Sequence, residues 1–252
     1  MADTTPTLVK DDPWLEPYAD VIRHRMKRCR EHLGEIRSKF GSLHDFADTH
    51  LRCGVHREEG SDSWTVREWA PAARAVSLLG DFNDWNPKIH PLAELGDGHW
   101  ETTLPGNALA HRQHLKLHII GADGSERDRI PACIRRTVQD EETHDYAGQI
   151  WAPLKPYEWQ HEFDPQSVGS PLIYEAHVGM AGEDPRVHTY REFAEHTLPR
   201  IKEAGYNVVQ FMAVAEHPYY GSFGYHVSNF FAPCSRYGTP EDLKHLVDTA
   251  HG

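Results

Sequence analysis

The sequence predicts a multi-domain chain: an N-terminal helix, an all-β sandwich, and a final segment in which strands alternate with helices. Three changes of pattern along the 252 residues indicate this division. Apolar residues first recur every three or four positions, then form short runs between turn residues, and finally form buried-strand runs separated by helical patterns. We expect domains at 14–61, 62–153 and 172–252, with a linker at 154–171.

The N-terminal segment carries an apolar stripe with helical spacing. The residues of this stripe are Ile22, Met26, Cys29, Leu33, Ile36 and Phe40, and they predict a helix over 14–40 that ends at Gly41. Basic residues lie between them, from Arg23 to Arg30. A basic helix can bind nucleic acid or a membrane, but this chain is acidic overall. We therefore interpret the basic residues as the solvated face of a packed helix.

The middle segment has the pattern of short strands. Trp64, Val66 and Glu68 alternate with their neighbours, and further apolar runs follow at Ala75 to Leu79, Trp100 to Leu104 and Leu115 to Ile120. Turn residues such as Asp97-Gly98 and Pro105-Gly106 separate these runs. Several short strands at such close spacing are typical of a small β-sandwich.

The last segment predicts a strand, a helix, a second strand and a second helix. The strands are Leu172 to Val178 and Val208 to Val214, and a long loop at 215–238 precedes the last helix. Thr189 with Glu192 predicts a capping box, and Thr239-Pro240-Glu241-Asp242 predicts a second helix start. This order implies a parallel sheet. Two strands cannot bury the faces of such a sheet, so we expect a sequence that is cut short.

Composition excludes several classes of protein. The chain has 26 basic and 38 acidic residues, a net charge of −12, which disfavours binding to a nucleic acid backbone. No apolar run approaches the roughly 20 residues that span a membrane, and no signal peptide is visible, so we expect a cytoplasmic protein without nucleic acid or membrane partners. The four Cys and nineteen His lack metal-ligand spacing, so no metal or cofactor is predicted.

Several stretches resemble one family. Arg67 to Ala73 and Gly80 to Asn86 resemble the immunoglobulin-like glucan-binding sandwich of 1,4-α-glucan branching enzymes, which belong to the α-amylase superfamily. Ile173 to Met180 resembles their first barrel strand, and 198–244 resembles the second strand with its loop and helix. The resemblance implies an N-terminal helix, a sandwich and the first two βα units of a truncated (β/α)8 barrel.

The resemblance also implies a reaction. These enzymes cut an α-1,4-glucan and transfer the released segment to a 6-hydroxyl, with two carboxylates roughly 5 Å apart as in retaining glycosidases. In the family those carboxylates come from the third barrel strand onward, so no catalytic residue is assigned, and we interpret Glu175 and Glu216 as structural. This chain alone is expected to bind an α-glucan such as glycogen, starch or amylose without catalysis.

Candidate contacts with the glucan are aromatic, because a ring can cover the C–H surface of a sugar. Tyr225 matches the active-site tyrosine of the family. On the sandwich, Trp85 lies in a polar turn, where a large apolar ring would be exposed to solvent unless it contacted a ligand. Trp69-Ala70-Pro71 is a second candidate, although Trp69 also fits a core position. Lys39 and Phe40, at the end of the helix, are expected in the same groove.

Two alternatives stay open. The helix and sandwich over 14–153 could form a stand-alone glucan-binding module, followed by a tail that does not fold alone. Debranching or trehalose-releasing relatives share the same layout of a sandwich and a barrel. The matches at 173–180 and 211–226 favour a branching enzyme over these relatives.

Overall fold

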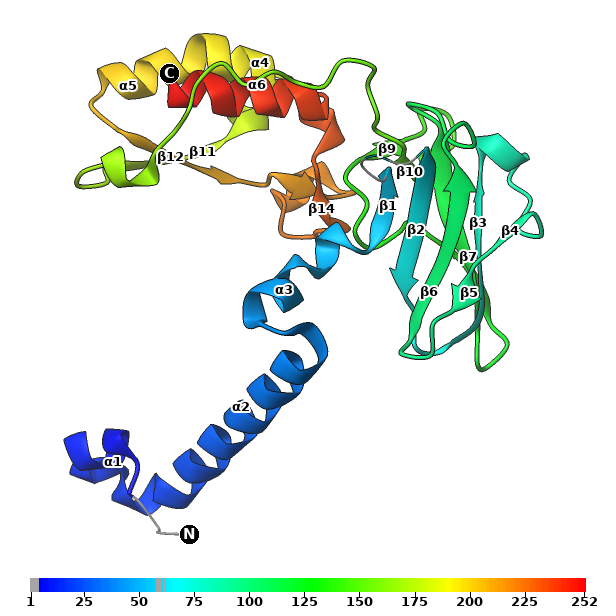
Figure 1. Ribbon diagram of the computed structural model, residues 1–252. Helices are drawn as coiled ribbons and strands as arrows, with labels where there is room; N and C mark the ends of the chain where they lie inside the picture. Colours follow the sequence, from blue (N-terminus) through cyan, green and yellow to red (C-terminus); the bar gives the residue numbers. More distant parts are fainter. Residues whose placement is uncertain (1–4, 58–59, 61) are drawn as a thin grey trace. The chain divides into compact units, whose positions relative to one another are not determined.

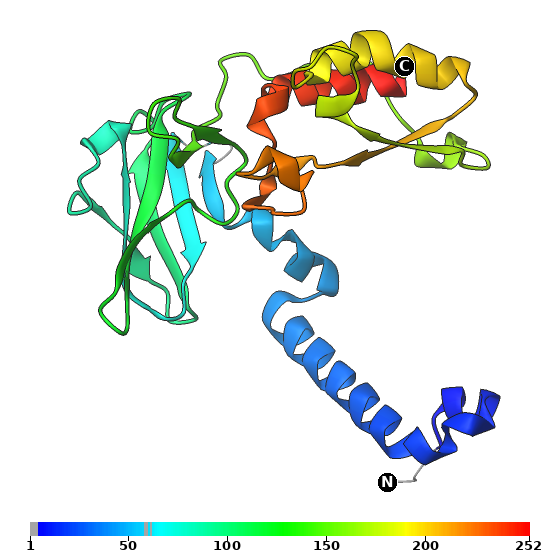
Figure 2. The same ribbon diagram turned by 180° about the vertical axis from the view of Figure 1, so that it is seen from behind.

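The computed structural model describes residues 5–57, 60 and 62–252 (Figures 1 and 2). The chain divides into two units, one ending at Leu51 and one beginning at Arg52. The first is helical. The second contains the sandwich and the strand–helix segment, which we call the barrel segment (172–252).

The first unit consists of short helices around one long helix. They are α1 (Thr7–Asp11), a 3₁₀ turn (Pro13–Tyr18), α2 (Ala19–Phe40), α3 (Leu43–Ala47) and a second 3₁₀ turn (Asp48–Leu51). The α-helix thus starts later than the expected residue 14, because Pro17 has no N–H and restricts the residue before it. Gly41, with φ of 85°, ends α2 as predicted, and its N–H bonds to the Arg37 carbonyl at 2.9 Å.

The apolar stripe of α2 is less covered than a packed helix requires. Ile36 is buried, but Met26 and Val21 are exposed in this unit. Phe40, at the end of the stripe, packs edge-on against Phe46 of α3, with ring centroids 5.1 Å apart. The prediction of a helix over this region is confirmed, and within the described residues of the unit its apolar face is only partly covered.

The sandwich consists of two antiparallel sheets. The first has the order β1-β2-β6-β5, with β1 (Gly54–Arg57), β2 (Ser63–Trp69), β5 (Ala93–Glu94) and β6 (His99–Pro105). The second has the order β4-β3-β7-β10-β9, with β8 also paired to β7; its strands are β3 (Ala73–Gly80), β4 (His90–Pro91), β7 (His114–Gly121), β8 (Glu126–Arg129), β9 (Thr137–Gln139) and β10 (Tyr146–Gln149). The predicted strands are all present, and β1 adds one before residue 62.

The core of the sandwich draws on both sheets. Alternation sends Leu115 and Leu117 of β7 inward, where neither has more than 1% of its surface exposed, while His114 and Lys116 face outward. Residues of the other sheet meet them. The buried cluster contains Trp64, Val66, Val76, Leu78, Leu92, Trp100, Leu104, Leu109, Leu115, Leu117, Ile134 and Ile150.

The barrel segment begins as the sequence predicts. Strands β11 (Ile173–His177) and β12 (Val208–Met212) pair in parallel, with Ile173 opposite Val208. Between them run α4 (Tyr190–Glu192), a π-helical turn (Phe193–Thr197) and α5 (Leu198–Glu203), and α6 (Pro240–His251) follows. The predicted capping box of Thr189 with Glu192 is present, and the predicted helix start at Thr239 is also a capping box, closed by Asp242.

The stretch expected as a long loop contains secondary structure. Strands β13 (Ala215–Glu216) and β14 (Asn229–Pro233) pair antiparallel within 215–238. The sequence pattern does not predict this pair of strands, because β13 is only two residues long and β14 ends in proline. The prediction of a loop over this whole stretch is therefore wrong.

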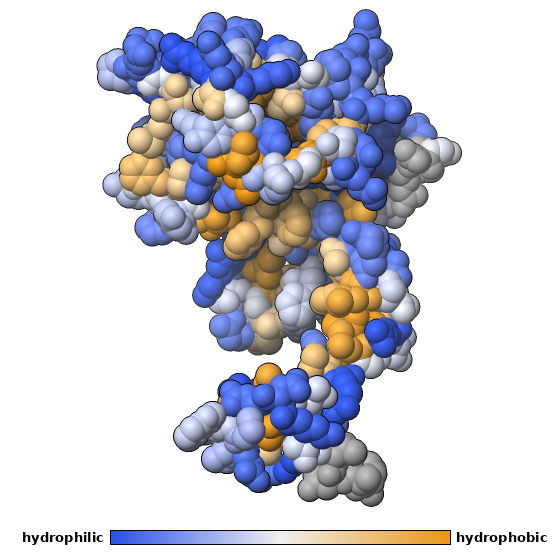
Figure 3. Space-filling model, turned by 90° about the vertical axis from the view of Figure 1, so that its left-hand side faces the viewer, coloured by the Kyte–Doolittle hydropathy of each residue, from blue (hydrophilic) through white to orange (hydrophobic). Residues whose placement is uncertain are grey.

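Helices cover one face of β11 and β12 (Figures 1 and 2). Their buried residues, among them Tyr190, Phe193 and Leu246, pack with Ala176 and Phe211 of the strands. On the strands, Ile173 keeps 52% of its surface exposed, and Leu172 next to it is also exposed. Hydrophobic patches accordingly interrupt the hydrophilic surface of the upper part of the molecule in Figure 3.

Buried polar contacts join the barrel segment to the edge of the sandwich. We call this region the junction, and Glu216 is its centre. Glu216 has no exposed surface, and its carboxylate accepts hydrogen bonds from the Thr137 hydroxyl of β9 and the Ser235 N–H, both at 2.9 Å. Arg236 lies 3.6 Å from the same carboxylate and donates to the Tyr146 hydroxyl of β10 at 2.7 Å.

The linker is tied to α6 by one carboxylate. Asp248 accepts hydrogen bonds from the Tyr157 hydroxyl at 2.7 Å and from the N–H groups of Gln160 and His161, each at 3.0 Å. Burial would raise the pKa of Asp248, but these bonds to its charged form outweigh it and hold the pKa at about 2. The linker is therefore an ordered part of the second unit.

Candidate functional site

A tight turn follows β3 and positions the first candidate residue. It begins at Gly80, where a Cβ atom would lie 2.1 Å from the His114 carbonyl, so only glycine fits. Asn83 fixes the turn from inside. Its amide oxygen accepts from the Gly80 N–H at 2.9 Å, and its nitrogen donates to the Leu78 carbonyl at 3.0 Å. Two hydrogen bonds from the Asn83 side chain therefore fix the turn to the end of β3.

Trp85 ends this turn in a strained conformation. Asp84 and Trp85 have φ values of 53° and 57°, in the left-handed region that ordinary residues avoid. The Trp85 N–H bonds to the Gly80 carbonyl at 3.0 Å, and its indole N–H donates to Asp81 at 3.1 Å. The ring still has 38% of its surface exposed. Strain held by surrounding bonds is common at functional sites, because it presents a side chain in one fixed pose.

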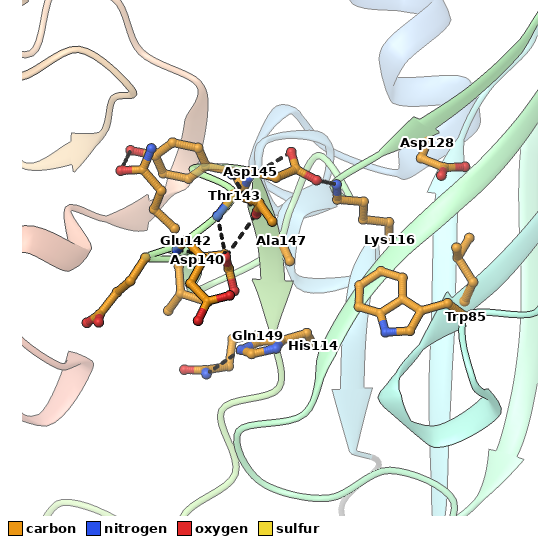
Figure 4. A pocket seen from close by; sticks show the side chains of 15 residues that line it. Trp85, His114, Lys116, Asp128, Asp140, Glu142, Thr143, Asp145, Ala147 and Gln149 are labelled. Atoms are coloured by element: carbon orange, nitrogen blue, oxygen red, sulfur yellow. Dashed lines mark hydrogen bonds and ion pairs between the residues drawn. The ribbon is translucent and has the colours of Figure 1, made fainter.

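Trp85 forms one wall of a cavity of about 870 Å³ on the outer face of the second sheet. Lys116 and His114 of β7 line it together with Tyr146 and Gln149 of β10 (Figure 4). These side chains meet because β7 pairs with β10 and the turn after β3 returns to the start of β7. We call this cavity the Trp85 pocket.

Acidic residues form the rim of the Trp85 pocket opposite the ring. Asp145 pairs with Lys116 at 2.5 Å, and this bond lowers the pKa of Asp145 (Figure 4). Asp140 accepts from the N–H and hydroxyl of Thr143, which lowers its pKa as well. At neutral pH the pocket thus offers one aromatic face beside carboxylates that accept hydrogen bonds and an ammonium group that donates them. Such a mixture suits a neutral molecule with many hydroxyl groups.

The second candidate, Trp69-Ala70-Pro71, lies at the other end of β3. Trp69 has 59% of its surface exposed, so the alternative that it is a core residue is wrong. A Cβ on Gly98 would lie 2.9 Å from the Pro71 side chain and 3.1 Å from the Trp69 indole nitrogen, so a glycine is required there. The Ala70 carbonyl accepts from the Trp100 indole at 3.0 Å. We call these residues the Trp69 platform.

The structure separates the two sandwich candidates. Ala73, just after the Trp69 platform, pairs with Gly121, whereas Gly80, just before Trp85, pairs with Leu115. They lie at opposite ends of β3, and an eight-residue strand is about 25 Å long. Trp69 and Trp85 therefore do not line one groove.

The remaining candidates lie elsewhere. Tyr225 follows a 3₁₀ turn (Tyr220–Ser222) in the barrel segment and has 82% of its surface exposed. Its N–H bonds to the Ser222 carbonyl at 3.0 Å. Lys39 and Phe40 belong to the last turn of α2 in the first unit, and whether they approach a glucan stays a prediction.

Within the described ranges the structure contains no group of three or more His, Cys, Asp or Glu residues placed to hold a metal ion. In the same part of the chain, no helix combines the length and the apolar character that crossing a membrane requires.

Comparison with known proteins first defines a class. The family described as carbohydrate-binding module 48 (isoamylase N-terminal domain) matches residues 52–134, which include most of the sandwich. Among solved structures, the chain resembles the pullulanase SAP of group B Streptococcus, with a TM-score of 0.61 and 16% identity over 79% of this chain and 32% of that one. The catalytic module of pneumococcal SpuA gives a TM-score of 0.62 at 17% identity, with 79% and 35% covered. Over most of its length the chain thus shares the fold of these two proteins, and its sandwich is a carbohydrate-binding module.

Sequence relatives then define the family. The chain is 45% identical to the 1,4-alpha-glucan-branching enzyme of Solanum tuberosum over 97% of its own length and 29% of that protein. The enzyme of Dictyostelium discoideum is 42% identical, with 97% and 36% covered, and that of Saccharomyces cerevisiae 42%, with 99% and 38% covered. The chain belongs to the family of 1,4-alpha-glucan-branching enzymes and corresponds to their N-terminal portion. It spans about a third of the length of these relatives.

Sequence reasoning missed the partners of Trp85. Lys116 stands between Leu115 and Leu117, so alternation alone shows that it faces outward. Lys116 lies close to Trp85 only because β3 pairs with β7, and the sequence does not reveal this pairing. His114 and Tyr146 were missed for the same reason.

Proposed function

We propose that this chain binds α-1,4-linked glucan through the Trp85 pocket, as the glucan-binding part of a 1,4-α-glucan branching enzyme of glycogen or starch synthesis. The observation that carries the proposal is the fixed, half-exposed indole beside Lys116. An aromatic face buries the C–H surface of a pyranose ring and leaves its hydroxyl groups free to bond with neighbouring polar groups. Lys116 then donates to a sugar oxygen, and Gln149 offers both an acceptor and donors.

The reaction belongs to the same proposal. A branching enzyme cuts an α-1,4 linkage and transfers the segment to a 6-hydroxyl through two successive displacements. We assign no residue of this chain to bond cleavage. Its contribution is to hold the polymer and, through Tyr225, to offer a ring to a bound sugar. A cytoplasmic location is part of the proposal.

Electrophoresis in native gels with and without glycogen tests the binding. We expect glycogen to retard the chain and the Trp85→Ala variant to lose most of that retardation. Lys116→Ala should bind more weakly than the unmodified chain. Trp14→Ala is the matched control, since it removes an exposed indole of the first unit. Equal mobility of the unmodified chain in both gels would contradict the proposal.

The branching activity needs a separate assay. A protein that contains this chain as its N-terminal portion should shift the spectrum of iodine-stained amylose, whereas residues 1–252 alone should not. Glycogen binding without any such shift, in the longer protein as well, would favour the stand-alone binding module instead.

A further inference from the structure

A second cavity adjoins the Trp69 platform, and its charge differs from that of the Trp85 pocket. Its volume is about 530 Å³. Ala70 and Pro71 form one side, Ile119 of β7 lies in the wall, and Arg127 and Arg129 of β8 complete the lining. We call it the arginine pocket.

The acidic and the basic side chains of strand β8 lie on opposite faces of the strand. Its residues 126 and 128 are acidic, and both pair with His118, with Asp128 at 2.8 Å and Glu126 at 3.6 Å. Because side chains alternate along a strand, Arg127 and Arg129 lie on the other face, roughly 7 Å apart. The nearest acidic residues of the strand are thus turned away from the two guanidinium groups.

The two arginines have no close partner in the described part of the chain. No hydrogen bond or ion pair joins either guanidinium group to a described residue; only their backbones pair, with β7. Asp123 is the acidic residue that lines the arginine pocket, and its carboxylate accepts from the N–H and hydroxyl of Ser125 at 3.0 and 2.7 Å. Arg127 attracts the Asp123 carboxylate only weakly, through a longer-range electrostatic interaction. The arginine pocket therefore keeps a net positive charge in a chain whose net charge is −12.

We propose that the arginine pocket binds a phosphate monoester carried by an α-glucan whose sugar rings lie on the Trp69 platform. Guanidinium groups bind phosphate oxygens with paired hydrogen bonds, and two of them on one strand face can hold one phosphate from both sides. The shared residues Ala70 and Pro71 join the apolar platform to the cationic pocket. This inference rests on the proposed glucan binding and adds a second contact for a phosphorylated form of the polymer, at the opposite end of β3 from the Trp85 pocket.

The test compares two polymers by calorimetry: a maltodextrin that carries 6-phosphate monoesters and its unphosphorylated parent. We expect the whole chain to bind the phosphorylated polymer about tenfold more tightly, since charge-assisted hydrogen bonds are the strong ones. Added salt should reduce this preference. The double variant Arg127→Ala and Arg129→Ala should bind both polymers equally. Both side chains are exposed, so circular dichroism should show an unchanged fold.

The control removes the same charge elsewhere. Arg28→Ala with Arg30→Ala changes two exposed arginines of α2 and should keep the full preference. Inorganic phosphate alone should bind much more weakly than the phosphorylated polymer, because it lacks the sugar contacts. Equal binding of inorganic phosphate and the phosphorylated polymer would overturn the proposal.

Two further results separate this proposal from the proposed function. Equal affinity of the unmodified chain for both polymers would overturn the phosphate site and leave glucan binding intact. A failure to bind the parent polymer would instead contradict the proposed function itself. A preference that survives in the double variant would place the phosphate outside the arginine pocket and so overturn the inference.

Discussion

The sandwich and the barrel segment bury their apolar residues in different ways. In the sandwich, two sheets face each other, and residues such as Leu78 and Leu115 are completely buried. In the barrel segment, helices cover one face of β11 and β12, while Ile173 remains half exposed. The sandwich thus has a closed core between two sheets, whereas the core of the barrel segment lies on one face of its strands and polar contacts at the junction tie the segment to the sandwich. Stability should therefore be distributed unevenly along the second unit.

The largest effect is expected at the junction. Glu216→Ala leaves the Thr137 hydroxyl and the Ser235 N–H buried without their acceptor and takes the carboxylate from Arg236. Breaking a buried ion pair in this way costs about 3–5 kcal/mol of unfolding free energy. Hydrogen exchange should show residues 172–252 opening more often while the sandwich stays protected.

A matched control for this variant is Glu175→Ala on β11, where the carboxylate is exposed. It should change stability by no more than about 0.5 kcal/mol. If Glu216→Ala loosened the sandwich as much as the barrel segment, the two regions would not differ in the way described above.

A smaller and pH-dependent effect is expected at the linker. The pKa of Asp248 is held at about 2, below its ordinary value of 3.8, so its ionised form favours the folded state. Its stabilisation is complete above pH 3.8 and is lost as the pH falls through about 2. Asp248→Asn should expose residues 157–161 to exchange at neutral pH, and its difference from the unmodified chain should shrink with acidification. A difference that grew as the pH fell would contradict this account.

The smallest effect is expected at the start of α4. Thr189 accepts the Glu192 N–H at 3.2 Å and completes a capping box, so Thr189→Ala should cost about 1 kcal/mol. Thermal unfolding measures this loss. Thr249→Ala, which alters an exposed threonine within α6, serves as the comparison and should cost less. Equal losses in the two variants would show that the cap contributes nothing specific.

Local patterns predicted most of the fold. The alternation around Val66, the capping box at Thr189 and the N-cap at Thr239 depend on residues close in sequence, and the structure contains each of them. The relation between Trp69 and Trp85 could not be predicted in this way, because it depends on the direction of β3 between them. The β13–β14 pair was missed since a two-residue strand leaves no periodic pattern. Local sequence therefore predicts the individual strands, turns and caps, whereas long-range strand pairing determines which of their residues meet in one site.

The measurement that tests the account most directly is hydrogen exchange of the whole chain with and without maltoheptaose. The account predicts slower exchange in the turn at 81–86 and along the rim at 138–146, both of which border the Trp85 pocket. The Trp85→Ala variant should lose this protection. Protection that is absent from both segments, or that persists in the variant, would contradict the claim that the Trp85 pocket binds the glucan.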